Sequence, residues 1–248
     1  RFGRAKDEDS VHDLFSRRIG AEAATVLAGS FVSGVYAGDL RALSARAAFP
    51  LLWRFEKTAG SLFIGAWRHF SKRAKEKRAA GIPSRRGLFS FNNGLGQLAD
   101  TLAKRLGAAL TLNAHVDTVS FSKDLWHVKC GERSYSATKL IIATPPHHAT
   151  VLLESSAPTV AALLSEIPMA PIAVVHLAYS CRLPTLPNGF GMLFSPYEQA
   201  KTLGVLFPSR LFSNRAPENG ELLTAFVGGV HNPEVLAYDD DKIIATVR

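Results

Sequence analysis

The stretch SFVSGVYAGD at residues 30–39 decides how the first third of the chain folds. It closes an alanine-rich segment, residues 21–32, that predicts a helix because alanine has the highest helix propensity. Gly34, Gly38 and Asp39 then break the helical pattern. On either side of this stretch, apolar spacing predicts further helices over 11–19, 44–57 and 61–80. The first third of the chain is therefore predicted to be helical.

The rest of the chain mixes helices with short strands. Strands are predicted where β-favouring residues lie between turn residues, at 88–91, 110–112, 116–121, 126–130, 139–143, 172–179, 189–194, 202–207 and 222–227. Residues 140–143 are apolar throughout, as in a strand that is covered on both faces. Two more helices are predicted over 98–106 and 159–166, and residues 81–84 form a linker. The fold class is therefore mixed, α+β or α/β.

Positive charge is concentrated in one segment of the chain. The net charge is +8, and residues 68–86 contain eight basic residues against Glu76 alone. Phe63, Trp67 and Phe70 recur at helical spacing on the other side of the same predicted helix. Such a helix suits the boundary of an anionic bilayer, although a surface helix with a solvated basic face also explains the pattern. Nucleic-acid binding is not predicted, because the basic residues have neither interleaved aromatic residues nor a recognition motif beside them.

Size and composition indicate a globular protein. The 248 residues are 47% hydrophobic and 20% charged, and no apolar run approaches the roughly 20 residues that cross a bilayer. Cys130 and Cys181 have no metal-ligand spacing, so we expect no metal site and a reducing compartment. The chain opens on Arg1, and residues 243–248 stop inside a predicted amphipathic helix. We therefore expect both termini to be cuts in a longer protein.

Familiar catalytic signatures are missing from the sequence. It contains no GxSxG elbow, phosphate-binding P-loop or HExxH helix, and Gly94-Leu95-Gly96 lacks the third glycine of a dinucleotide fingerprint. His147 and His148 are predicted to be an exposed loop pair, and the acidic residues 239–241 to begin a helix. Residue chemistry alone predicts an α+β domain with a basic amphipathic helix.

Several segments, in order along nearly the whole chain, resemble the protoporphyrinogen oxidases, a family of flavoenzymes. The most characteristic is the stretch at 30–39, which closes the alanine-rich segment. The other matching segments are 9–20, 43–44, 47–50, 56–62, 90–95, 142–145, 189–191, 212–217 and 226–229. Residues 142–145 fit flavin amine oxidases in general, whereas the combination at 212–217 and 226–229 is absent from monoamine oxidases.

The resemblance implies the central part of an FAD-dependent, amine-oxidase-like fold. Residues 1–86 would form a helical membrane-binding lobe, 87–145 a segment of the FAD-binding domain, and 146–248 part of a mixed-sheet substrate lobe. The implied reaction is the FAD-dependent oxidation of protoporphyrinogen IX, or a close porphyrinogen, to the porphyrin in haem or chlorophyll synthesis, with molecular oxygen as the acceptor. The family's glycine-rich pyrophosphate turn and its substrate-carboxylate arginine would lie upstream of residue 1, and a second flavin-contacting segment downstream of residue 248.

The resemblance also assigns roles to individual residues. Val116 matches a position whose main chain contacts the FAD adenine. Substrate positions are matched by Gly34, Phe190, Ile172 and, more loosely, Leu163 or Leu164. The membrane contact implied for the helical lobe would fall on Trp67, Phe70, Lys72 and Arg73. No residue is assigned as a catalytic acid or base, because the flavin carries the chemistry in this family.

Two alternatives stay open at this point. The first is another flavin amine oxidase relative, such as a phytoene desaturase or an amine oxidase, and the second is a non-catalytic, membrane-associated binding fragment. The implied location is cytoplasmic and peripheral to a membrane, or an organelle inner membrane in a eukaryote. Anionic lipid is an expected partner, and a homodimer is left open.

Overall fold

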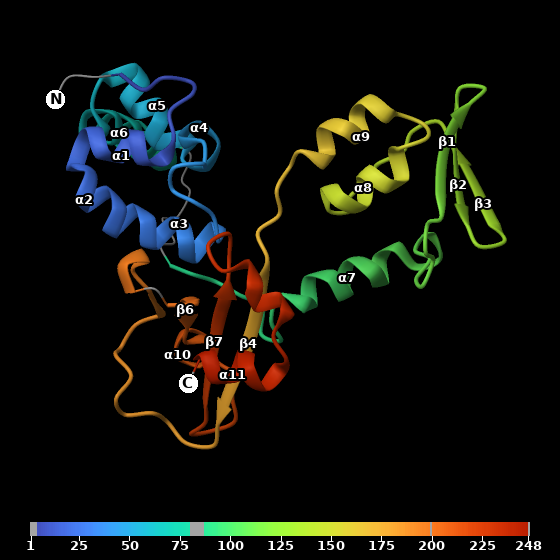
Figure 1. Ribbon diagram of the computed structural model, residues 1–248. Coiled ribbons are helices and arrows are strands. Elements are labelled where there is room, and N and C mark those ends of the chain that lie inside the picture. The colour runs from blue at the N-terminus through green and yellow to red at the C-terminus, as the bar shows by residue number, and fades with distance from the viewer. Residues whose placement is uncertain (1–3, 80–86, 199, 248) are drawn as a thin grey trace. The chain divides into compact units, whose positions relative to one another are not determined.

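The computed structural model describes residues 4–79, 87–198 and 200–247 (Figure 1). Two compact units are present: unit 1 comprises residues 1–94 and 170–248, and unit 2 comprises residues 95–169. The predicted linker at 81–84 lies outside the described residues, as do Arg85 and Arg86 and the side chains of Lys77 and Arg78. This division concerns which residues pack together, so the functional lobes predicted at 1–86, 87–145 and 146–248 remain predictions.

The first part of unit 1 is helical, as predicted. Its first helix begins after Ser10, whose hydroxyl accepts a hydrogen bond from the Asp13 amide while the Asp13 carboxylate accepts one from the Ser10 amide. This reciprocal cap satisfies two amides that have no partner within the helix. The elements are α1 (Val11–Ile19), α2 (Ala21–Ala23), the π-helix η1 (Ala24–Ala28), α3 (Gly29–Tyr36), α4 (Ala45–Ala48), α5 (Pro50–Ala59) and α6 (Leu62–Ala79).

The predicted break at Gly34 is wrong. Residues 21–36 are helical throughout, and the helix ends at Ala37, which adopts a left-handed conformation with φ of 50°. Glycine weakens a helix because it loses more backbone entropy than other residues. Here packing offsets that cost, since Gly34 leaves space for a side chain of a neighbouring strand.

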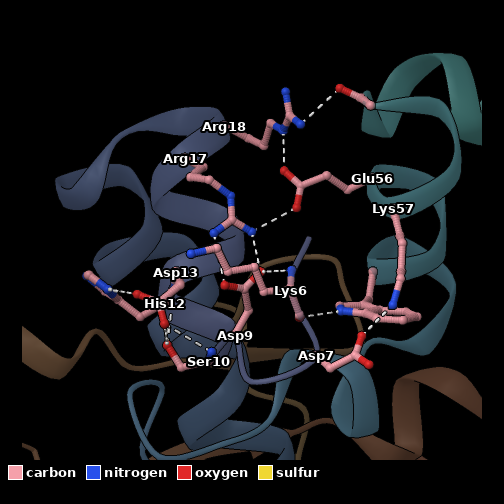
Figure 2. Close-up of polar contacts among 12 residues, drawn as sticks. Lys6, Asp7, Asp9, Ser10, His12, Asp13, Arg17, Arg18, Glu56 and Lys57 are labelled. Carbon is pink, nitrogen blue, oxygen red and sulfur yellow. Dashed lines mark hydrogen bonds and ion pairs between the residues drawn. The ribbon is translucent and has the colours of Figure 1, made fainter. Parts of the chain in front are cut away.

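A buried group of charges joins α1 to α5 (Figure 2). The fully buried carboxylate of Glu56 accepts hydrogen bonds from Arg17 at 2.9 Å and from Arg18 at 2.5 Å. Arg17 also donates two hydrogen bonds to Asp9, which raise the pKa of its guanidinium and keep it charged. Each carboxylate thus has a cationic partner, as buried charges require.

The second part of unit 1 is a four-stranded antiparallel sheet with the order β4-β7-β6-β5 (Figure 1). The strands predicted in this region are confirmed as β4 (Ile172–Tyr179), β5 (Gly191–Leu193), β6 (Thr202–Leu206) and β7 (Glu221–Gly228). Val175, Ala225 and Val227 pack on one face of the sheet against η4 (Pro233–Ala237) and α11 (Asp240–Val247). The alternate residues therefore point to the opposite face.

Arg215 connects two distant segments of unit 1. Its guanidinium donates hydrogen bonds to the main-chain oxygen of Asn92 at 2.9 Å, to that of Phe91 at 2.7 Å and to the Ser90 hydroxyl at 3.0 Å. The strand predicted at 88–91 is wrong, because these residues have no strand conformation. The Arg215 side chain therefore anchors a segment that is not paired as a strand.

Unit 2 contains a helix, a three-stranded meander and a helical pair. Lys123 and Asp124 both have positive φ, as a tight hairpin turn requires, and this confirms the predicted turn. The elements are α7 (Gly96–Leu106), η2 (Gly107–Ala109), β1 (Thr118–Ser122), β2 (Leu125–Cys130), β3 (Arg133–Ala137), α8 (Pro146–Leu153) and α9 (Pro158–Ser165).

The strands predicted at 110–112 and 139–143 are wrong, and β3 was not predicted. Residues 139–143 are not paired with any described strand, and the Ile141 side chain is 89% exposed. An apolar run becomes a strand only where its main-chain groups find partners. By contrast, Arg133–Ala137 has little apolar character but pairs with β2 along its full length.

Two smaller expectations concern helix starts. His147 and His148 lie in the first turn of α8, so the predicted loop pair is wrong, although both are exposed. The acidic residues at 239–241 do begin a helix, and Asp239 accepts a hydrogen bond from the Lys242 amide. Among the helices that the structure describes, none is both long and apolar enough to cross a bilayer.

Candidate functional site

An apolar cavity of about 620 Å³ lies in unit 1 between α3 and the sheet face that α11 leaves open. Its volume falls in the range of roughly 300–1,000 Å³ that is typical of ligand sites. The cavity is lined by Phe31, Gly34, Val35, Ile172, Phe190, Gly191, Met192, Leu193, Gly204, Val205, Leu206 and Phe226. None of these residues is charged, so the walls favour a large apolar ligand over an ionic one.

Strand register explains why these residues meet. Phe226 on β7 is paired with Val174 on β4 and with Gly204 on β6, so these residues occupy one face of the sheet. Gly204 is paired in turn with Leu193 on β5, which extends the same face. Successive strand residues point to opposite faces, and the face with Phe226 is therefore the one directed at the cavity.

The helical wall follows from the spacing of α3. Phe31, Gly34 and Val35 are three and four residues apart, so they share one side of the helix. Phe31 and Val35 contribute large apolar side chains that are 42% and 57% exposed. Between them, Gly34 contributes space.

Leu193 is held between two glycines. A Cβ atom built on Gly34 would lie closer than 3.0 Å to Cδ2 of Leu193, and one built on Gly204 would lie 2.9 Å from the same atom. Real Cβ atoms do not show such separations. The missing side chains thus let α3 approach β5 and β6 closely and shape this end of the cavity.

The structure brings together three of the residues that the family resemblance assigns to substrate. Gly34, Ile172 and Phe190 come from distant parts of the chain and line the same cavity. The resemblance did not point to Leu193, Leu206 or Phe226, although alternation within the predicted strands could have found them. Their contribution to a site remains a prediction.

The other assigned residues lie elsewhere. Leu163, which is 61% exposed, and Leu164 belong to α9 of unit 2 and do not line this cavity. Val116 also lies in unit 2, half-buried and two residues before β1. Its main-chain groups fall outside the paired register of β1 and β2, which begins at Thr118, and the assigned contact with FAD remains a prediction.

A second candidate surface lies on α6. The helix packs on α5 through Gly65, which leaves no room for a side chain against Phe55. Phe63 is 88% exposed, Trp67 is 71% exposed, and Phe70 is also exposed. Lys72 and Arg73 follow in the next turn and are exposed as well. Aromatic and basic side chains thus share the solvent-facing part of one helix.

Comparison with known proteins places the chain in a family. The profile described as "Flavin containing amine oxidoreductase" matches residues 3–248. The chloroplastic protoporphyrinogen oxidase of Nicotiana tabacum is 32% identical over 257 residues, which cover 97% of this chain and 47% of that protein. The protoporphyrinogen oxidase of Homo sapiens is 30% identical and covers 92% of this chain and 49% of that protein. The predicted resemblance is confirmed, and the chain spans about half the length of these curated relatives.

Solved structures agree on the fold. A protein from Exiguobacterium sp. 255-15, assigned as a protoporphyrinogen oxidase, superposes with a TM-score of 0.76 at 20% identity over 99% of this chain and 51% of that one. A putrescine oxidase superposes with a TM-score of 0.64 at 18% identity over 97% of this chain and 49% of that one. The predicted mixed fold of amine-oxidase type is confirmed. The chain belongs to the flavin containing amine oxidoreductase family.

Proposed function

We propose that the protein to which this chain belongs is an FAD-dependent oxidase that converts protoporphyrinogen IX, or a close porphyrinogen, to the porphyrin, and that the apolar cavity binds the tetrapyrrole. The observation that carries the proposal is the convergence of Gly34, Ile172 and Phe190 on one cavity. The named relatives, which are protoporphyrinogen oxidases, support the substrate class.

The cavity residues bind and orient the substrate in this proposal. Phe190 and Phe226 offer aromatic surfaces to a flat ring system, and Ile172 packs against it. Apolar walls exclude water from the ring carbons. The main chain at Val116 contributes to holding the adenine of FAD. When bound, the flavin supplies hydride acceptance and the transfer of electrons to molecular oxygen.

Titration of the protein with protoporphyrin IX, monitored by fluorescence quenching, tests whether the cavity binds the tetrapyrrole. Ile172→Glu places a charge on the cavity wall, and the dissociation constant should rise by about tenfold or more, or about 1.4 kcal/mol. Val160→Glu is a matched control, because Val160 is an apolar residue of similar exposure in α9 that does not line the cavity. Equal affinity for both variants and the unchanged chain would remove the cavity from the substrate site.

The proposal extends to the membrane. Exposed aromatic side chains beside Lys72 and Arg73 suit an anionic lipid surface, where each basic residue contributes about 1 kcal/mol. The curated relatives include chloroplastic and mitochondrial enzymes, which supports a location in such an organelle. The homodimer that the sequence leaves open is tested by sedimentation.

Vesicle cosedimentation tests the membrane contact. Changing Lys72 and Arg73 to Gln should weaken binding to anionic vesicles by about thirtyfold at low salt and leave binding to neutral vesicles unaltered. The same change at Lys104 and Arg105 of α7 is the control. If both pairs reduce binding equally, net charge is responsible and α6 is not the contact.

A further inference from the structure

The connection from β4 to β5 leads directly to the cavity. Residues 180–190 contain no helix or strand, and they end at Phe190, whose side chain lines the cavity. Such an irregular segment has no ladder of its own to fix its path. The position of Phe190 must therefore depend on contacts that this segment makes with other elements.

Arg210 on α10 (Pro208–Leu211) supplies those contacts. Its guanidinium donates hydrogen bonds to three main-chain oxygens of the connection: Leu183 at 2.8 Å, Leu186 at 2.8 Å and Pro187 at 3.1 Å. A planar guanidinium with five donors can hold several carbonyl groups at once in a fixed geometry, which a lysine cannot. Arg210 thus fixes the middle of the connection.

Glu221 at the start of β7 fixes Arg210. Its carboxylate, which is 2% exposed, accepts hydrogen bonds from the Arg210 Nε at 3.0 Å and Nη2 at 2.8 Å. The same carboxylate accepts from the Ser209 hydroxyl at 3.0 Å and the Leu183 amide at 3.2 Å. A bidentate pair of this kind is charge-assisted and directional.

The end of the connection, at Phe190, is held by the residue that precedes α10. The amide of Phe207, directly before α10, donates to the Phe190 carbonyl at 2.9 Å, and the Arg210 amide donates to the Phe207 carbonyl at 3.0 Å. Phe207 is fully buried, so this link is anchored in the core. The middle and the end of the connection therefore depend on α10 and on Phe207 directly before it.

We propose that Arg210 and Glu221 are positioning residues that set Phe190 against the tetrapyrrole, an inference that rests on the proposed function of the cavity. Neither residue lines the cavity, so neither contacts the ligand. They act through the path of the connection between β4 and β5. A small displacement of an aromatic wall reduces its overlap with a flat ligand.

Hydrogen exchange tests the positioning directly. In Arg210→Gln, the amides of Leu183 and Phe207 should exchange at least about tenfold faster, equivalent to about 1.4 kcal/mol of lost protection. Arg182→Gln is the control, because Arg182 is an exposed arginine of the same connection. Arg210→Lys keeps the positive charge but lacks the planar guanidinium with its several donors, so it should restore protection from exchange only in part. Unchanged exchange in Arg210→Gln overturns the inference.

A double-mutant cycle with protoporphyrin IX separates positioning from general stability. Phe190→Ala and Arg210→Gln should each weaken binding by about tenfold, and the double variant should be no weaker than Phe190→Ala alone, because Arg210 acts through Phe190. Additive losses show that Arg210 acts independently and overturn the inference. If Phe190→Ala binds normally while Arg210→Gln shows the faster exchange, the proposed substrate site fails and the hydrogen-bonded connection stands.

Discussion

Replacing Gly34 by alanine tests the close packing of α3 on the sheet. A methyl group there would lie closer than 3.0 Å to Leu193 Cδ2 and 3.4 Å from the Leu203 carbonyl oxygen. Glycine-to-alanine changes inside helices normally stabilise by about 0.5–1 kcal/mol, whereas overpacking costs about 1–3 kcal/mol. Overpacking should dominate, because the new methyl group takes space that the Leu193 side chain fills between Gly34 and Gly204. We expect a net loss of about 1–2 kcal/mol.

Thermal unfolding measures this loss. For a chain of this size, a loss of about 1–2 kcal/mol lowers Tm by roughly 2–8 °C. Gly96→Ala is the matched control: Gly96 begins α7, and a Cβ atom there would meet nothing within 4 Å, so Tm should not fall. Adding Leu193→Ala to Gly34→Ala should recover part of the loss, because it removes the atom that the new methyl group meets.

Binding of protoporphyrin IX should fall in the same variant, because Leu193, which lines the cavity, must shift to admit the new methyl group. The reasoning is refuted if Gly34→Ala raises Tm as an ordinary helical alanine does. It is also refuted if Leu193→Ala lowers stability equally in the unchanged chain and in the Gly34→Ala variant, because the two sites would then be uncoupled.

Three further changes test the packing of unit 1. Glu56→Gln should cost about 3 kcal/mol in urea unfolding, because it removes a fully buried charge from its partners Arg17 and Arg18. Glu76→Gln on exposed α6 should change stability by less than about 0.5 kcal/mol, and equal effects would refute the buried network. The hydrogen bonds and charge of Arg210 lower the pKa of Glu221 from 4.5 to about 2. The ionised carboxylate therefore stabilises the fold fully above pH 4.5. The difference in stability between the unchanged chain and the Glu221→Gln variant should shrink as the pH falls from 4.5 to about 2. A constant difference across that range would contradict the pKa assignment. Ser10→Ala should lower stability by about 1 kcal/mol through loss of the α1 cap, and no change in urea midpoint would show that the cap is dispensable.

Local sequence pattern predicted the sheet of unit 1 better than the strands before it. Alternation and turn residues predicted where β4 and β7 begin and end, because each of these strands has one packed face and one open face. The run at 140–143 is more apolar than either strand, yet it is unpaired among the described residues. Hydrophobicity shows that a segment favours burial, but pairing depends on partners from other parts of the chain.

The candidate site could be predicted only in part. Family resemblance singled out Gly34 and Phe190, but their spacing in the sequence contains no sign that they meet. The role of Gly34 was misjudged because a helix-breaking residue and a residue that admits a neighbouring side chain look the same in a sequence. The role of Arg210 could not be predicted because three of its partners are main-chain oxygens, which every residue type has.

The hydrogen bonds of Arg215 have a consequence for how this fold can vary. They join residues that are separated by 123 to 125 positions in the sequence. They hold the segment of unit 1 that precedes unit 2, and pairing with β7 holds β4, which follows unit 2. Unit 2 is thus an insertion with both of its ends anchored in unit 1. The entropy of closing such a loop grows only with the logarithm of its length, about 0.6 kcal/mol for each doubling. The entropy cost that the insertion imposes on unit 1 therefore depends only weakly on the length of the inserted segment.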